Sequence, residues 1–166
     1  MAESTVALEQ PTVTSAPRRL VLFRHEIVDH ADLGRVIPAS FGELYGAIGR
    51  SDTHPAGPPF VVYRTGSQVG VRWDIDICAP VAGPMTEPPG FEFTEMPVGT
   101  VLSLLYVGPY EGLGKAYGEI ESYITEHGLQ QAGPPREFYF SEPDVPPSQT
   151  RTMIEWPVAE LSGSRA

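Results

Sequence analysis

An internal repeat limits what this chain can fold into more than any other feature. The tetrapeptide Ala-Gly-Pro-Pro occurs at 56–59 and again at 132–135, and a tyrosine follows each copy at the same distance, Tyr63 and then Tyr139. Further matches lie in the same order around it, 45–48 with 117–120 and 77–81 with 154–158. Three ordered matches indicate that one supersecondary unit occurs twice, with a longer helix in the second copy.

Each copy predicts the order helix, Gly-Pro turn, strand, loop, strand. Apolar residues recur at helical spacing, and the Pro-Pro pairs that follow cannot continue a helix and send the chain out extended. The apolar positions of the first predicted helix are Phe41, Leu44, Tyr45 and Ile48, and those of the second are Leu113, Ala116, Tyr117, Ile120, Tyr123 and Ile124.

Runs rich in β-branched and aromatic residues predict the strands of a sheet. They lie at 20–24, 60–64, 70–79, 91–94, 100–106, 137–140 and 151–156, with polar or Pro-rich external connections at 25–38, 81–90 and 141–150. The predicted helices are too few to provide a crossover for every strand pair. We therefore predict an α+β fold, with a mainly antiparallel sheet and helices on one face.

The chain of 166 residues fits one domain built from two small halves. We predict a disordered tail over 1–17, because it is rich in Ser, Thr, Ala and Pro and lacks the apolar core of a secretory signal. The folded domain is expected over 18–160, as half-repeats of about 18–90 and 91–160, followed by a flexible C-terminus at 161–166.

Charge, hydropathy and cysteine content bound the class of protein. No run of 18 apolar residues is present, so no membrane span is expected, and the single cysteine excludes an intramolecular disulfide. Both features suit a soluble cytoplasmic protein. The net charge of −10 argues against nucleic acid as a direct partner. An acidic surface attracts cationic ligands, although improved solubility is the simpler explanation of the charge.

Several superficial motifs do not predict a cofactor, a metal or a catalytic residue. The glycines at 112, 114 and 118 lack dinucleotide-loop spacing, and a parallel βαβ unit is not expected around them. His25 and His30 are five residues apart, which places them on different faces of a helix, so they are not expected to bind one metal ion together. Cys78 is best interpreted as a small, partly buried hydrophobic residue rather than a nucleophile. No G-x-S-x-G elbow is present.

Strand alternation divides the last strand of each copy into two faces. One face carries Asp74, Asp76 and Cys78 in the first copy, and Arg151, Met153 and Glu155 in the second. The isoleucines lie on the opposite face, which suits the helices. The acidic face is either an ordinary solvated sheet surface or, joined by Trp73, Tyr106 and Tyr139, a surface for lipophilic cations. Cation–π contact stabilises such ligands by about 0.5–2 kcal/mol.

The second half resembles a known family. Tyr-Val-Gly-Pro-Tyr-Glu at 106–111, a helix, Gly-Pro-Pro, Phe-Tyr-Phe at 138–140 and the segment 151–158 are similar to the GyrI-like family. The same domain is the effector-binding domain of many AraC- and MerR-type multidrug regulators. The resemblance is strong over about 100–158 and weaker over about 18–81. It implies a pseudo-twofold tandem of βαββ units, the SHS2 module, with a ligand groove between the halves.

The resemblance also implies functions and site residues. Relatives bind hydrophobic, often cationic drugs; one inhibits DNA gyrase by protein contact, and others hydrolyse cyclopropane-bearing DNA alkylators. Many relatives carry His where Tyr106 stands and Glu where Met153 stands, and Glu155 is expected to supply the missing charge. Tyr110 and Glu111 match the family pattern. The predicted ligand-binding residues are Glu155, Tyr106, Tyr110, Glu111, Met153, Tyr139, Trp73 and Asp76.

We therefore predict a stand-alone multidrug-binding protein for lipophilic, aromatic, cationic compounds, because a 17-residue tail has no room for a helix-turn-helix. Whether the protein is also an enzyme stays open. One alternative is a hydrolase of electrophilic small molecules, in which Glu111 or Glu155 and a tyrosine activate water. Another is an inhibitor that contacts DNA gyrase. Monomer and dimer are both compatible with the sequence.

Overall fold

The computed structural model describes residues 7–8, 10–65, 72–140 and 144–161. The chain divides into two compact units, one formed by Pro17–Val98 and the other by Met1–Ala16 together with Gly99–Ala166. We call them the first-repeat unit and the second-repeat unit, after the copy of the repeat that each contains.

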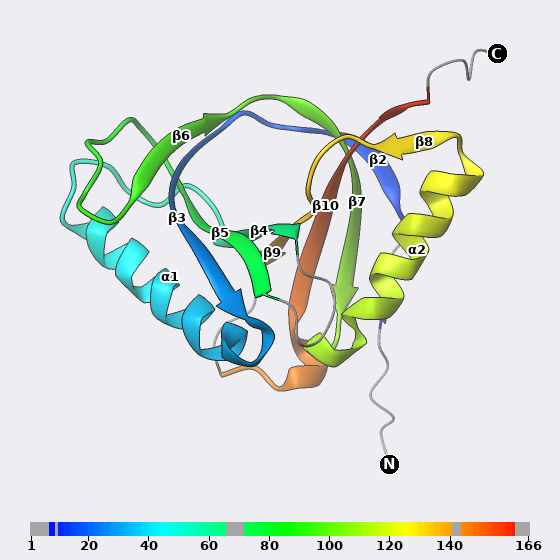
Figure 1. Ribbon diagram of the computed structural model, residues 1–166, viewed down its shortest axis with the longest axis horizontal. Coiled ribbons are helices and arrows are strands. Elements are labelled where there is room, and N and C mark those ends of the chain that lie inside the picture. Colours follow the sequence, from blue (N-terminus) through cyan, green and yellow to red (C-terminus); the bar gives the residue numbers. More distant parts are fainter. Residues whose placement is uncertain (1–6, 9, 66–71, 141–143, 162–166) are drawn as a thin grey trace. The chain divides into compact units, whose positions relative to one another are not determined.

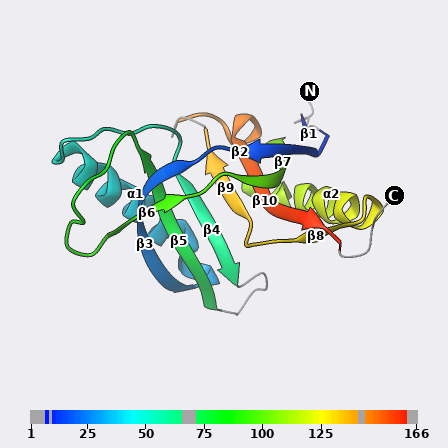
Figure 2. The ribbon, with the colours of Figure 1, turned by 90° about the horizontal axis from the view of Figure 1, so that it is seen from above.

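The first-repeat unit is an antiparallel sheet with one long helix (Figures 1 and 2). Its strands lie in the order β6-β3-β5-β4. The elements are β3 (Arg19–Asp29), η1 (His30–Asp32), α1 (Leu33–Gly49), β4 (Phe60–Thr65), β5 (Arg72–Val81) and β6 (Glu92–Met96). Leu44, Ala47 and Ile48 of α1 are buried. Arg24, directly opposite Ile77, contacts Glu43 of α1, so the isoleucine face of β5 is the helix face, as predicted.

The second-repeat unit repeats this arrangement with additional strands (Figure 1). Its elements are β1 (Ala7–Leu8), β2 (Thr12–Ala16), β7 (Gly99–Val107), η2 (Tyr110–Gly112), α2 (Leu113–Glu126), β8 (Leu129–Gln131), β9 (Arg136–Tyr139), η3 (Pro147–Gln149) and β10 (Arg151–Glu160). β7 pairs with β10, β10 pairs with β9 and β8, and β1 and β2 pair with β7. The core between α2 and this sheet is formed by Leu102, Leu104, Tyr106, Ala116, Ile120, Ile124, Ile154, Trp156 and Val158.

Both units have the same βαββ topology. In each, the strand before the helix pairs with the last strand, and the last strand pairs with the middle one: β3-β5-β4 and β7-β10-β9. All these pairings are antiparallel. The α+β fold and the duplicated unit predicted from the repeat are confirmed, because the same apolar pattern buries the same face of the last strand twice.

Several predicted boundaries are wrong. Thr12–Ala16 lies in the predicted disordered tail but forms β2 along β7, because its alternating Thr and Val residues complete the edge of the sheet. The predicted connection at 25–38 is instead the end of β3, the turn η1 and the start of α1. Pro38 lies within α1 near its beginning, where a proline removes one helical hydrogen bond. β6 pairs with β3, so it belongs to the first-repeat unit and not to the half at 91–160.

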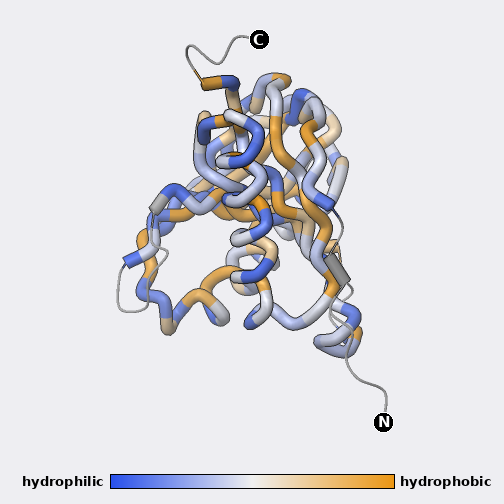
Figure 3. The backbone as a smooth tube through the Cα atoms, turned by 90° about the vertical axis from the view of Figure 1, so that its right-hand side faces the viewer, coloured by the Kyte–Doolittle hydropathy of each residue, from blue (hydrophilic) through white to orange (hydrophobic). Residues whose placement is uncertain are grey.

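Other predicted boundaries fall on residues that are not described. The predicted start of the strand at 70 lies outside the described residues, as do 141–143 of the connection at 141–150 and 162–166 of the predicted C-terminus. Among the described residues, no helix has the length and apolar character needed to cross a membrane. Short hydrophobic and hydrophilic stretches alternate along the chain instead (Figure 3).

Candidate functional site

The helix-facing side of β9 carries an acidic residue that sequence analysis did not select. Glu137 lies directly opposite Ile154 of β10, and Tyr139 lies opposite Thr152. Directly paired residues of antiparallel strands share a face, and Ile154 packs in the core against α2. Glu137 and Tyr139 therefore face α2, on the side of the sheet away from Glu155.

Two phenols hold the carboxylate of Glu137. Tyr117 of α2 donates its hydroxyl to Oε2 at 2.5 Å, and Tyr139 donates to Oε1 at 2.9 Å. Only 7% of Glu137 is exposed. A buried charge is costly unless it is hydrogen-bonded, and hydrogen bonds to an ionised acceptor are about twice as strong as neutral ones. The two phenols thus stabilise a negative charge beneath the surface of this unit.

Tyr110 forms the outer edge of the same group. It lies in η2, its ring meets that of Tyr139 edge to face at 6.1 Å, and 55% of the residue is exposed. Burial and the negative charge of Glu137 both raise the pKa of Tyr110, so its phenol stays neutral through the physiological range. We call Glu137, Tyr110, Tyr117 and Tyr139 the phenol–carboxylate cluster. Trp156 lies behind it, edge to face with Tyr117 at 5.7 Å.

Two predicted ligand residues, Tyr110 and Tyr139, are brought together in this cluster, whereas Tyr106 is placed in the core. Tyr106 is fully buried, and its hydroxyl donates to the carbonyl oxygen of Pro109 at 2.6 Å. A Cβ at Gly112 would lie 2.0 Å from that hydroxyl, so the turn into α2 closes tightly over the ring. Burial is the main cause of its raised pKa, and the charge of exposed Glu111 contributes.

Glu155 and Met153 lie on the opposite face of β10, as strand alternation predicts. Glu155 is not an isolated charge: the Arg136 guanidinium donates to its Oε1 at 3.1 Å, and both side chains are almost nine-tenths buried. Ser103 donates its hydroxyl to the sulfur of Met153 at 3.0 Å. This arrangement satisfies the Glu155 charge inside the protein.

Trp73 and Asp76 belong to the first-repeat unit. Trp73 lies edge to face with Tyr63 at 5.5 Å and beside His30 at 5.6 Å. Asp76 is 5% exposed and accepts hydrogen bonds from Arg64 at 2.6 and 2.9 Å, while His25 Nδ1 lies 2.8 Å away. Within the described ranges, no group of three or more His, Cys, Asp or Glu side chains is arranged to hold a metal ion.

The repeat contains the signal that identifies Glu137. Aligning the two Ala-Gly-Pro-Pro segments places Glu137 on Val61 and Tyr139 on Tyr63. Val61 is completely buried on the helix-facing side of β4, opposite Ile77. An acid at the position of a buried valine needs hydrogen-bond partners, and this requirement makes Glu137 a candidate for a functional site.

Comparison with known proteins identifies the family. The model of the GyrI-like small molecule binding domain matches residues 10–159, nearly the whole chain. The chain belongs to the GyrI-like family. It is accordingly a GyrI-like small-molecule binding domain. No curated protein sequence matches it significantly.

Solved structures share the fold. The C-terminal domain of EcmrR superposes with a TM-score of 0.78 at 21% identity, covering 92% of this chain and 98% of that one. EcmrR in a DNA complex gives a TM-score of 0.81 at 21% identity and 92% coverage, but this chain spans only 58% of that EcmrR chain. SAV2435 bound to tetraphenylphosphonium has a TM-score of 0.59 at 11% identity, covering 91% of this chain and 94% of that one.

Proposed function

We propose that this GyrI-like domain binds small lipophilic aromatic cations at the phenol–carboxylate cluster, with Glu137 as the residue that recognises charge. The observation that carries the proposal is a carboxylate only 7% exposed, held by two phenols on the helix-facing side of β9. A buried acid surrounded by aromatic rings attracts a cation through Coulomb interaction in a low local dielectric and through the faces of the rings.

The hydrogen bonds within the cluster favour one type of cation. Both oxygens of Glu137 accept hydrogen bonds from tyrosine hydroxyls, so a protonated amine must compete with phenol donors for them. A quaternary onium ion has no donor and interacts with the carboxylate by charge alone, while its aromatic or alkyl groups contact the rings. The ligand class is therefore lipophilic cations without N–H groups. The SAV2435 complex, with tetraphenylphosphonium, is consistent with this class.

Of the predicted residues, Tyr110 and Tyr139 contact the ligand in this proposal, and Tyr117 and Glu137 join them. Glu155 is assigned a structural role because Arg136 pairs with it. Two functions suggested by the family resemblance, hydrolysis and gyrase inhibition, are not proposed here, because no contact in the cluster favours them over ligand binding.

A fluorescence binding screen tests the proposal with aromatic compounds of matched size that are cationic, neutral or anionic. We expect saturable binding of onium cations at micromolar concentrations, about −8 kcal/mol. Neutral analogues should bind about 10–100-fold more weakly, because they lose the Coulomb attraction to the buried carboxylate, worth about 1.5–3 kcal/mol once desolvation of the cation is subtracted. A protein that binds none of the cations, or that binds neutral and cationic analogues equally, contradicts the proposed function.

A further inference from the structure

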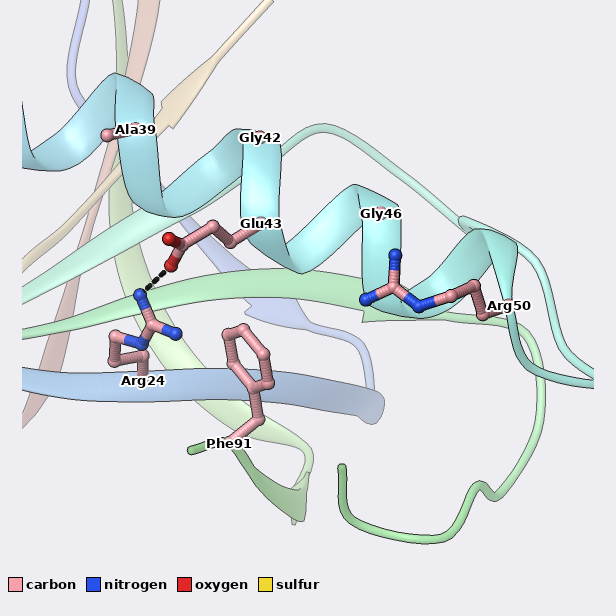
Figure 4. A pocket seen from close by; sticks show the side chains of 7 residues that line it. All are labelled: Arg24, Ala39, Gly42, Glu43, Gly46, Arg50 and Phe91. Carbon is pink, nitrogen blue, oxygen red and sulfur yellow. Dashed lines mark hydrogen bonds and ion pairs between the residues drawn. The ribbon is translucent and has the colours of Figure 1, made fainter. Parts of the chain in front are cut away.

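The lining of a groove in the first-repeat unit is positively charged, whereas the chain as a whole is acidic. The groove has a volume of about 450 Å³ and runs along α1, lined by Arg24, Ala39, Gly42, Glu43, Gly46, Arg50 and Phe91 (Figure 4). Two arginines and one glutamate make the formal charge of the lining +1, in a chain whose net charge is −10. Its volume lies in the usual range of small-molecule sites.

One wall of the groove is held together by contacts of Arg24. The Arg24 guanidinium lies over the ring of Phe91, 4.4 Å from its centroid, and forms an ion pair with Glu43 of α1 (Figure 4). Its Nε also points to the carbonyl oxygen of Gly90 at 3.5 Å. Arg24 thus ties the β3 strand to α1 and to the segment that leads into β6. The charge of Arg24 is compensated by Glu43.

Arg50 is the second cation of the lining. Its guanidinium lies back along α1, with Nη1 3.3 Å from where a Cβ on Gly46 would stand (Figure 4). In the part of the chain that the structure describes, no carboxylate pairs with it. A guanidinium presents a planar set of donors that matches a carboxylate in a bidentate arrangement.

The rest of the lining suits a flat apolar group. Ala39, Gly42 and Gly46 lie on the groove side of α1, and a Cβ added at Gly42 would meet nothing within 4 Å. At Gly42 the helix therefore offers an open surface without a side chain, and the Phe91 ring lies across from it (Figure 4). Glu43 repels a dianion more than a monoanion, so the lining favours a single negative charge.

We propose that this groove binds a small aromatic carboxylate, with Arg50 pairing the carboxylate and the ring lying between Phe91 and the glycines of α1. The ligand class is opposite in charge to that of the phenol–carboxylate cluster, and the two sites share no residue. Binding at one is therefore testable without binding at the other.

The probe is 1-naphthoate, titrated into isotope-labelled protein while amide shifts are followed by NMR. We expect saturable shifts at Gly42, Gly46 and Phe91 at millimolar concentrations. Arg50→Gln should weaken binding about tenfold, the effect of losing one charge-assisted contact. Gly42→Leu fills the open space and should abolish binding. Arg35→Gln, an exposed arginine on the same helix outside the groove, is the matched control and should leave affinity unchanged.

The proposal would be overturned by any one of the following results: no shifts at the groove residues, unchanged affinity in both Arg50→Gln and Gly42→Leu, or equal binding of neutral 1-naphthalenemethanol. Inorganic phosphate binding as tightly as naphthoate would also overturn it, since that result indicates an anion patch with no selectivity for an aromatic carboxylate. Thermal melts of each variant verify folding, and Gly42→Leu should raise rather than lower helix stability.

Discussion

Replacing Glu137 with Gln separates charge recognition from packing, because the two side chains have the same shape. At about 4–6 Å and an effective dielectric of about 20, a carboxylate and a bound cation interact by about 3–4 kcal/mol. Part of this is offset by desolvation of the cation, and we expect a loss of about 2 kcal/mol, or about 30-fold in affinity.

The same substitution has a smaller effect on folding. The two phenolic hydrogen bonds at 2.5 and 2.9 Å become neutral and lose about 1 kcal/mol each, while the cost of burying a charge disappears. Stability should therefore change by less than about 2 kcal/mol.

Glu155→Gln is the matched control. Glu155 is 8% exposed and Glu137 is 7% exposed, but Glu155 lies on the other face of β10 and pairs with Arg136. Its neutralisation leaves a buried guanidinium without a counter-charge, which should lower stability by about 2–4 kcal/mol and leave cation affinity unchanged. Calorimetric titration with tetraphenylphosphonium and urea unfolding of both variants measure the two effects separately.

The opposite pattern of effects would contradict the role assigned to Glu137. If Glu155→Gln weakened cation binding about tenfold and Glu137→Gln did not, Glu155, the acid expected from the sequence, would be the ligand-binding residue. The phenol–carboxylate cluster would then be a structural feature of the second-repeat unit.

Three further predictions concern the tyrosines. Tyr110→Leu removes the exposed ring beside Tyr139 and should weaken cation binding by about 0.5–2 kcal/mol in the same titration. Gly112→Ala brings a Cβ to 2.0 Å from the Tyr106 hydroxyl and should destabilise the protein by about 1–3 kcal/mol in urea unfolding. The double variant Gly112→Ala/Tyr106→Phe lacks that hydroxyl and should recover part of the lost stability. No recovery would show that the clash lies elsewhere. Because the Tyr106 pKa is raised in the folded protein, its contribution to stability is complete below the unfolded pKa of about 10 and falls as pH rises beyond it. Tyr106→Phe should flatten that decline, and an unchanged slope would contradict it.

The fold could be predicted from the sequence because the repeat relates segments that are far apart in the chain. Matching segments such as 77–81 and 154–158 must bury the same face, so Ile77 and Ile154 were assigned correctly to the helix side. β2 was not accessible, because the composition of 12–16 resembles a disordered tail and only pairing with β7 makes it a strand.

The site was less accessible, because it depends on strand register. Alternation alone places Glu137 and Tyr139 on one face of a short strand, but it does not say which face is covered by a helix. The pairing of Glu137 with Ile154 decides this. The hydrogen bond from Tyr117 could likewise not be predicted, because the sequence pattern assigns Tyr117 only to the apolar face of a helix. The equivalence of Glu137 with buried Val61 was the available clue.

Calorimetric titration of the unmodified protein with tetraphenylphosphonium and with tetraphenylborate isolates the charge preference of the proposed site, since the two ions have the same shape and opposite charge. Recognition by the buried Glu137 carboxylate predicts saturable micromolar binding of the phosphonium and at least about 100-fold weaker binding of the borate. Equal affinity for the two ions, or tighter binding of the borate, would contradict the account.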